Sequence, residues 1–360
     1  MDGTNAGQPA PYQTPPDPGQ TPPEPGSKSR RTLVALAKFA IPVAIIVFLL
    51  WNIDEEKRAA LVDSQKDYVL LSIALVIAIG AMALSFARWC VLVRCQGIEL
   101  SMLEAQRLGA ICFLLSFVSA GSVGGDVFKA IFLAKRRPGK RVEAVASVLV
   151  DRGAGLYGLL LLVAAALLFL DSPTSGEVMQ RVTWGTAAFV GVGTIVLAVL
   201  IFGGKLVDRL IQWGSQLPLI GGIVNRIGPP LRVFHHHPVA FGMSIVMSLG
   251  VQSLLVLSMY FVAQGIYSET PTLAEHFVIV PIGMLMSALP LAPAGLGLLE
   301  YAIGKMYKVV PAVPTKASGV IVALVFEIVK IVVAVIGTIF YWTASEEIQQ
   351  SLEQAETEPT

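Results

Sequence analysis

Long apolar stretches alternate with short polar segments along most of the chain. Each stretch has close to the 20 or so apolar residues that a helix needs to cross the hydrocarbon core of a bilayer. The stretches cover residues 33–51, 68–89, 142–170, 183–202, 240–261 and 317–342. The pattern therefore predicts an all-α integral membrane protein with about six transmembrane helices.

Two further apolar stretches are interrupted near their middle, and neither half is long enough to cross a bilayer. The first runs from 108 to 135 and is broken at 121–125, and the second runs from 277 to 310 and is broken at 290–297. Non-helical backbone at membrane depth is tolerated only inside protein or beside a water-filled cavity. We therefore predict two re-entrant helical hairpins. For the first stretch, one continuous kinked helix is the alternative.

Basic residues set the expected orientation. Five of them lie between Lys135 and Arg141, directly after the first hairpin, and Arg88, Arg94 and Arg107 precede it. Because cytoplasmic loops are enriched in Lys and Arg, we place both ends of this hairpin and both chain termini in the cytoplasm. The second hairpin then enters from the opposite side. Two opposed broken hairpins are typical of an inverted repeat with a substrate site near the bilayer midplane.

Composition supports this assignment and divides the chain into three regions. Of its 360 residues, 54% are hydrophobic and only 14% are charged, whereas soluble domains have about 25% charged residues. Residues 1–32 are a Pro-rich tail that cannot bury enough apolar surface to fold, so we predict a disordered cytoplasmic segment. Residues 33–343 form the transmembrane domain, and 344–360 form an acidic cytoplasmic tail. The Pro-rich tail leaves open a protein partner, alongside a membrane lipid. We expect no nucleic-acid partner.

The chain contains none of the short motifs that mark soluble hydrolases, redox enzymes or nucleotide-binding loops. Its three cysteines, Cys90, Cys95 and Cys112, lie in or beside apolar segments and are predicted to be buried free thiols. The run His235-His236-His237 fits an interfacial polar cluster better than a metal site, because adjacent histidines point in different directions on a helix. We therefore expect no enzyme activity, no cofactor, no catalytic residue and no metal ligand.

Ionisable side chains at membrane depth are costly and by default mark a function. A helix that starts at a break also offers free N–H groups to an anion. The candidate binding residues are Gly124, Gly125, Asp126, Lys129, Asp151, Arg152, Gly297, Glu300, Glu327 and Lys330. We expect the glycines to shape the breaks, a basic residue to meet a phosphate, and the carboxylates to orient the bases or meet an amine. The alternative is that neighbouring charges only neutralise each other.

Three segments in order resemble the flippase-like membrane domain of lysylphosphatidylglycerol synthases. They are Leu114–Lys129, Asp151-Arg152-Gly153 and Leu289–Gly297, and the resemblance extends over about residues 33–343. Ser122 stands where the family usually has arginine, and Asp151 stands where it has glutamate.

The resemblance implies a multi-pass protein of the cytoplasmic membrane that moves or accommodates a lipid headgroup, on a phospholipid or a polyprenyl phosphate. In the bifunctional relatives a separate soluble domain performs aminoacyl transfer, and the tail after Trp342 is too short to contain one. Two rival functions differ in class. A proton- or ion-coupled transporter of a small solute also needs carboxylates at broken helices. A non-transporting scaffold would keep its function after neutralisation of every buried charge.

The hairpin predicts the topology of its two ends. Cysteines placed at Arg107 and Lys140 should both react with a membrane-impermeant thiol reagent from the cytoplasmic side, because the chain enters and leaves the membrane on one face. Labelling of the two positions from opposite faces would contradict the hairpin and favour a simple span.

Overall fold

The computed structural model describes residues 66–118, 124–137, 139–169, 177–202, 204–216, 221–289 and 297–342. The predicted first span at 33–51 and both tails lie outside these residues, as do the central parts of both breaks, 119–123 and 290–296. Every regular element of the described part is a helix, which confirms an all-α protein.

Five of the helices are long and apolar enough to cross a membrane. They are α3 (Tyr68–Cys95), α6 (Arg141–Phe169), α7 (Glu177–Phe202), α10 (Pro238–Ile266) and α13 (Gly319–Trp342). All five coincide with stretches that hydropathy predicts as spans. The protein is therefore a multi-pass membrane protein.

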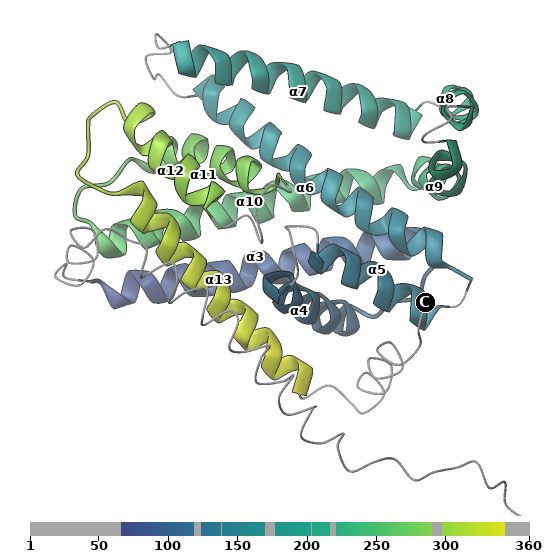
Figure 1. Cartoon of the computed structure of the whole chain (residues 1–360), viewed down its shortest axis with the longest axis horizontal. Helices are drawn as coiled ribbons and strands as arrows, with labels where there is room; N and C mark the ends of the chain where they lie inside the picture. Colours follow the sequence, from purple (N-terminus) through teal and green to yellow (C-terminus); the bar gives the residue numbers. More distant parts are fainter. Residues whose placement is uncertain are drawn as a thin grey trace, which may run out of the picture.

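Each interrupted stretch forms two shorter helices that pack against one another. The first pair is α4 (Met102–Val118) and α5 (Gly124–Arg136), and the second is α11 (Leu273–Ser287) and α12 (Leu298–Val309). A continuous kinked helix would not fold its own halves together, so a helical hairpin is correct for the first stretch. Figure 1 shows α4 and α5 in the right half of the molecule and α11 and α12 in the left half.

The open ends of both hairpins are fastened by polar contacts between their two helices. In the first hairpin, Arg136 Nη1 lies 2.8 Å from Glu104 Oε1. In the second, the hydroxyl of Tyr307 lies 2.8 Å from Nε2 of His276, whose Nδ1 faces the Thr272 carbonyl oxygen at 2.9 Å. Each hairpin is therefore held together as a unit at the end opposite its break.

The core is built on close contact between α3 and α10. Ala74, Ala78 and Ala81 of α3 are buried, and the hydroxyl of Ser258 on α10 donates to the Ala74 carbonyl oxygen at 2.8 Å. Small side chains let helices approach closely in lipid, where packing and interhelical hydrogen bonds replace the hydrophobic effect. This pair forms the central layer, with the two hairpins, α6 and α13 arranged around it.

The remaining helices lie towards one end of the bundle. They are α8 (Lys205–Ser215), α9 (Gly221–Val233) and the short η1 (Phe234–His236). Trp213 of α8 is 65% exposed, which suits an amphipathic helix that lies on a membrane surface. In Figure 1, α8 and α9 follow the right-hand end of α7.

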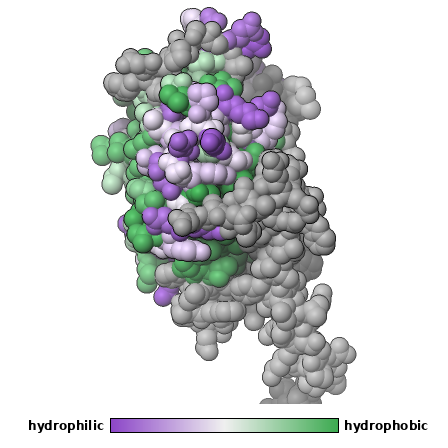
Figure 2. Space-filling view, turned by 90° about the vertical axis from the view of Figure 1, so that its left-hand side faces the viewer, coloured by the Kyte–Doolittle hydropathy of each residue, from purple (hydrophilic) through white to green (hydrophobic). Residues whose placement is uncertain are grey.

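The opposite end of the bundle presents a polar face. Figure 2 shows hydrophilic residues gathered in the middle of this face, with hydrophobic residues at its margins. The chain segments that reach it carry the exposed residues Asp67, Glu269, Lys305, Lys308 and Lys316. By contrast, α7 exposes Trp184, Phe189 and Ile195 along its length. This distribution suits helices whose sides face lipid and whose ends face water.

Gly125 is required for close packing rather than for an unusual backbone angle. It lies in the first turn of α5, and a Cβ atom there would be 2.7 Å from the Cys112 carbonyl oxygen and 3.0 Å from Ser116 Cβ. The left-handed conformation that favours glycine occurs instead at Gly297, with φ +84° at the start of α12. The two glycines therefore shape their hairpins in different ways.

Replacing Gly125 with alanine should destabilise the protein by about 1–3 kcal/mol, because the new methyl group overpacks the α4–α5 contact. Thermal unfolding in detergent measures this loss. Gly185→Ala is the matched control, since a Cβ at Gly185 of α7 meets nothing within 4 Å. Equal melting temperatures for the two variants would contradict the close-packing role.

Candidate functional site

Four of the candidate residues meet where α5 packs on α6. Arg152 Nη1 lies 2.6 Å from Asp126 Oδ2. Lys129 Nζ lies between two carboxylates, 3.7 Å from Asp126 Oδ1 and 3.6 Å from Asp151 Oδ2. Asp126 and Lys129 occupy the first turns of α5, directly after the first break, and α6 contributes Asp151 and Arg152. Asp126 and Lys129 thus pair within α5, and further ion pairs join both residues to α6.

A fifth residue, Arg88 of α3, completes this group. Its Nε lies 2.8 Å from Asp151 Oδ1, and its Nη1 donates to the Ser248 hydroxyl of α10 at 2.8 Å. Arg88 is only 5% exposed, so it lies inside the helical bundle and not in a surface loop. The sequence signal that identifies it is a charged residue inside an otherwise apolar span. We call Arg88, Asp126, Lys129, Asp151 and Arg152 the central charge cluster.

Burial changes steadily across the central charge cluster. The side chains of Arg88 and Asp151 are 6% and 5% exposed, and that of Lys129 is 10% exposed. The side chains of Arg152 and Asp126 are 25% and 23% exposed. Lys129 Nζ also lies over the ring of Trp89, 5.4 Å from its centroid, as in a cation–π contact. The cluster thus has a buried inner end and an accessible outer end.

Arg152 connects the two hairpins. Besides its ion pair with Asp126, its Nη2 donates to the carbonyl oxygen of Ala288 at 3.3 Å. Asp126 follows the first break, and Ala288 is the C-cap residue of α11, directly before the second break. The residues that flank the two breaks therefore meet at one guanidinium, as expected if broken helices converge on a site.

The other three charged candidates form a second group on α12 and α13. Oε2 of Glu300 accepts the N–H of Gly297 at 2.7 Å, and Lys330 Nζ lies 2.7 Å from Glu327 Oε1. Glu300 and Glu327 are 6% and 2% exposed. Within the described part of the chain, Glu300 Oε1 and Glu327 Oε2 have no hydrogen-bond partner. We call Glu300, Glu327 and Lys330 the acidic cluster.

The acidic cluster lies next to the first hairpin as well as the second. Ile331 and Ala334 of α13 pack with Leu114 and Phe117, near the C-terminal end of α4. A Cβ at Gly337 would lie 3.1 Å from Ala110 Cβ, so α13 and α4 run antiparallel. Lys330 is therefore close to the point where α4 ends and the first break begins.

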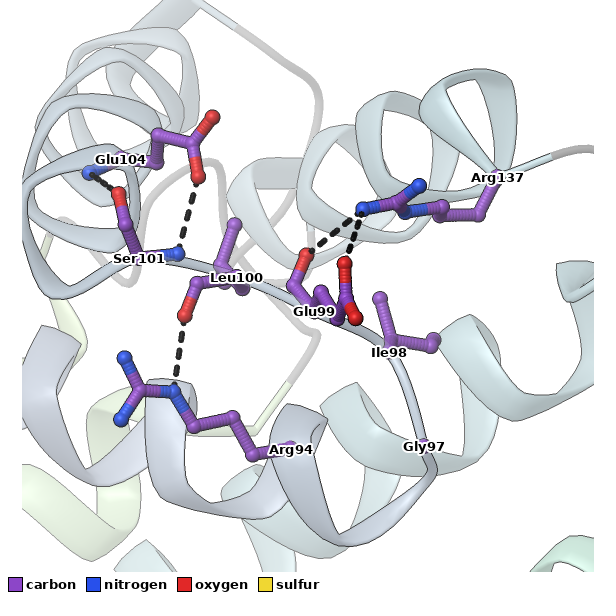
Figure 3. Close-up of a pocket in the computed structure, with 8 residues that line it drawn as sticks. All are labelled: Arg94, Gly97, Ile98, Glu99, Leu100, Ser101, Glu104 and Arg137. Atoms are coloured by element: carbon purple, nitrogen blue, oxygen red, sulfur yellow. Dashed lines mark hydrogen bonds and ion pairs between the residues drawn. The ribbon is translucent and has the colours of Figure 1, made fainter.

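The clearest hollow in the described part of the molecule is separate from both clusters. It has a volume of about 660 Å³ and lies at the connection between α3 and α4. Figure 3 shows Arg137 reaching the carbonyl and carboxylate oxygens of Glu99, and Arg94 Nε donating to the Leu100 carbonyl oxygen at 2.8 Å. Nearby, hydrogen bonds from Ser101 and the charge of Arg136 hold the pKa of Glu104 below its usual range. These contacts fix a short connection beside the basic run.

Comparison with known proteins agrees with the resemblance found in the motifs. Residues 34–337 match the family described as the Lysylphosphatidylglycerol synthase TM region. A curated relative is Glycosyltransferase AglD from Haloferax volcanii, 28% identical over 244 residues, which make up 59% of this chain and 39% of that protein. The matched segment is thus about two fifths of the relative. No solved structure matches. Since the family match covers most of the chain, this protein belongs to the family of the lysylphosphatidylglycerol synthase transmembrane region.

Proposed function

We propose that this protein binds the phosphate-bearing headgroup of a membrane lipid at the central charge cluster and moves it across the cytoplasmic membrane. The observation that carries the proposal is the position of Arg152, which pairs with Asp126 at 2.6 Å and hydrogen-bonds to Ala288 at 3.3 Å. A ligand that displaces either contact acts on both broken hairpins together.

The charge of the cluster favours an anion. Its three cationic side chains, from Arg88, Lys129 and Arg152, exceed its two carboxylates by one. An uncompensated charge inside an apolar bundle costs several kcal/mol. One phosphodiester or lipid phosphate supplies the missing negative charge. The phosphodiester of a phospholipid meets this requirement with one negative charge, and the monoester of a polyprenyl phosphate carries up to two.

The exposure of the side chains determines which of them the headgroup meets first. The headgroup reaches Arg152 and Asp126 first, because these side chains are about a quarter exposed and the inner pair is almost fully buried. A guanidinium can bind two oxygens of a phosphate through two parallel hydrogen bonds. Arg152 contacts Asp126 through the one oxygen Oδ2, so a phosphate can displace Asp126 from Arg152. When the headgroup has bound to Arg152, Asp126 stays paired with Lys129. The Arg88–Asp151 ion pair does not change.

The hairpins provide the moving parts. Each is fastened at its open end, by Glu104–Arg136 in one and His276–Tyr307 in the other. Movement of one repeat against the other around a fixed site is the usual mechanism when broken helices meet at the midplane. Release of Ala288 by Arg152 lets the hairpins separate on one side. The acyl or prenyl chains stay in the bilayer beside the apolar helices.

Family membership supports a lipid ligand, since the family is that of a lipid synthase membrane region. We propose a non-enzymatic role for the residues of this region, in the cytoplasmic membrane, with both termini in the cytoplasm. A proton- or ion-coupled transporter of a small solute is the second candidate. The unpartnered carboxylate oxygens of Glu300 and Glu327 favour it.

Substitution of Arg152 tests headgroup binding. Arg152→Lys keeps the positive charge and removes the two-pronged contact, so transbilayer movement should slow by roughly tenfold to a hundredfold, equivalent to the 1.5–3 kcal/mol of a charge-assisted hydrogen bond. The measurement is loss of a fluorescent anionic phospholipid from the outer leaflet of reconstituted vesicles. The control is Arg181→Lys, whose side chain is 81% exposed on α7. A wild-type rate for folded Arg152→Lys would contradict the proposal.

A second set of variants separates binding from stability. Asp151→Asn should lower the free energy of unfolding by about 3–5 kcal/mol, because it leaves Arg88 buried without its carboxylate. The double variant Asp126→Asn with Lys129→Gln removes one charge of each sign and keeps the Arg88–Asp151 pair. It should fold with a smaller loss and still fail to move lipid. Chemical unfolding and the vesicle assay measure the two properties, and full transport by the double variant would show that headgroup movement does not need this pair.

A further inference from the structure

Two carboxylate oxygens of the acidic cluster take part in no hydrogen bond with the described residues. Glu300 uses Oε2 to accept the Gly297 N–H, and Glu327 uses Oε1 to pair with Lys330. The second oxygen of each carboxyl group is buried and has no hydrogen-bond partner among the described residues. An ionised carboxylate oxygen without a partner in an apolar interior is unfavourable. Protonation removes the charge, and a neutral hydroxyl costs less to bury than a charged oxygen.

The charges of the acidic cluster do not balance when all three groups are ionised. Two carboxylates face one ammonium, which leaves one excess negative charge. The start of α12 offsets part of the charge on Glu300, because Gly297 donates its N–H there. Glu327 lies in the middle of α13, away from any helix end, and is 2% exposed. One bound proton neutralises the cluster.

No described residue around Glu327 other than Lys330 supplies a positive charge. Glu300 of α12 and Lys330 of α13 itself are the charged groups that act on it. α3 and α10 contribute apolar side chains to the core that contains Phe326 and Val329. The ionisable residues of α4 are Glu104, Arg107 and Cys112. The two charged ones lie in the first turns of α4, whose opposite end packs near Lys330.

We propose that Glu300 and Glu327 form a proton-binding site that takes up one proton in each transport cycle and so couples headgroup movement to a proton gradient. This rests on the proposed function of the central charge cluster. The proton comes from water on one side of the membrane, binds to a carboxylate oxygen of the acidic cluster and leaves to water on the other side. A proton suits the site better than an ammonium headgroup, because a carboxyl group that is 2% exposed excludes a bulky cation.

The net charges of the two clusters are equal and opposite. Without ligands, the central charge cluster has one excess positive charge and the acidic cluster one excess negative charge. An anionic headgroup neutralises the first, and a proton neutralises the second, so the summed charge of the two clusters is zero both without ligands and with both bound. Taking up only one of the two leaves an uncompensated charge in the bundle, which costs several kcal/mol. The structure thus favours movement of one proton with one negative charge.

Lys330 provides a physical link between the two events. Its ammonium lies 2.7 Å from Glu327, and its side chain is 22% exposed. Protonation of Glu327 removes the charge that holds Lys330. The Lys330 ammonium can then bind an anion near the C-terminal end of α4, since Ile331 packs beside Leu114 and Phe117. The protonated state therefore binds the headgroup more tightly than the ionised state.

The proton site is tested directly by infrared difference spectroscopy of the purified full chain in lipid nanodiscs, titrated from acidic to alkaline pH. Wild type should show a buried protonated-carboxyl band that disappears as pH rises. Glu300→Gln and Glu327→Gln should each reduce or shift this band. Glu177→Gln is the control, because that side chain is 86% exposed, and it should leave the band unchanged. If removal of Glu327 leaves Lys330 unpaired and prevents folding, Glu327→Gln with Lys330→Met removes both charges together.

Transport separates this proposal from the proposed function. A proton gradient across reconstituted vesicles should change the rate of anionic phospholipid movement severalfold in wild type and not in Glu300→Gln. A band that neither glutamine variant alters would overturn the proton site. Lipid movement that ignores the gradient in wild type would overturn the coupling and leave headgroup transport intact. A band that the variants remove, in a protein that moves no lipid, would keep the proton site and overturn headgroup transport.

Discussion

The cost of holding ionised groups inside an apolar helical bundle is the constraint on which this structure depends. Asp151 meets it by accepting two cations at once, Arg88 of α3 at 2.8 Å and Lys129 of α5 at 3.6 Å. These contacts tie a hairpin helix to two transmembrane helices through one carboxylate. The charge that is expensive to bury therefore also fixes the relative positions of three elements, because loss of any partner exposes the others to the full penalty.

The breaks of the two hairpins also place polar groups inside the apolar bundle. A break frees backbone groups that lipid cannot satisfy, so it must lie against protein or water. Here the residues around both breaks face ionisable side chains: Asp126 follows the first, and Gly297 donates to Glu300 after the second. Arg152 then reaches Ala288 before the second break. The polar groups that make the breaks tolerable are the same groups that we propose as the binding site.

The spans and the hairpins could be predicted from the sequence, because hydropathy and glycine or proline breaks report on local segments. The partners of each charge could not. Arg88 and Asp151 are 63 positions apart and meet only through the packing of α3 on α6. Sequence proximity suggested that Asp126 would pair with Lys129, yet its shorter contact is to Arg152. Asp126 does contact Lys129 at 3.7 Å, and Glu327 and Lys330 also pair as expected, since each pair shares one helix face.

The side chains of the two clusters differ in their exposure, so the clusters suit ligands of different size. The central charge cluster ends in two side chains that are about a quarter exposed, so its outer end is accessible to solvent. The carboxyl groups of the acidic cluster are nearly inaccessible, and their unpartnered oxygens lie where only a very small ligand can bind. Opposite excess charges in one bundle attract and lower each other's burial cost. A change in either cluster therefore alters the free energy of the other, which is the requirement for coupling two ligands through one protein.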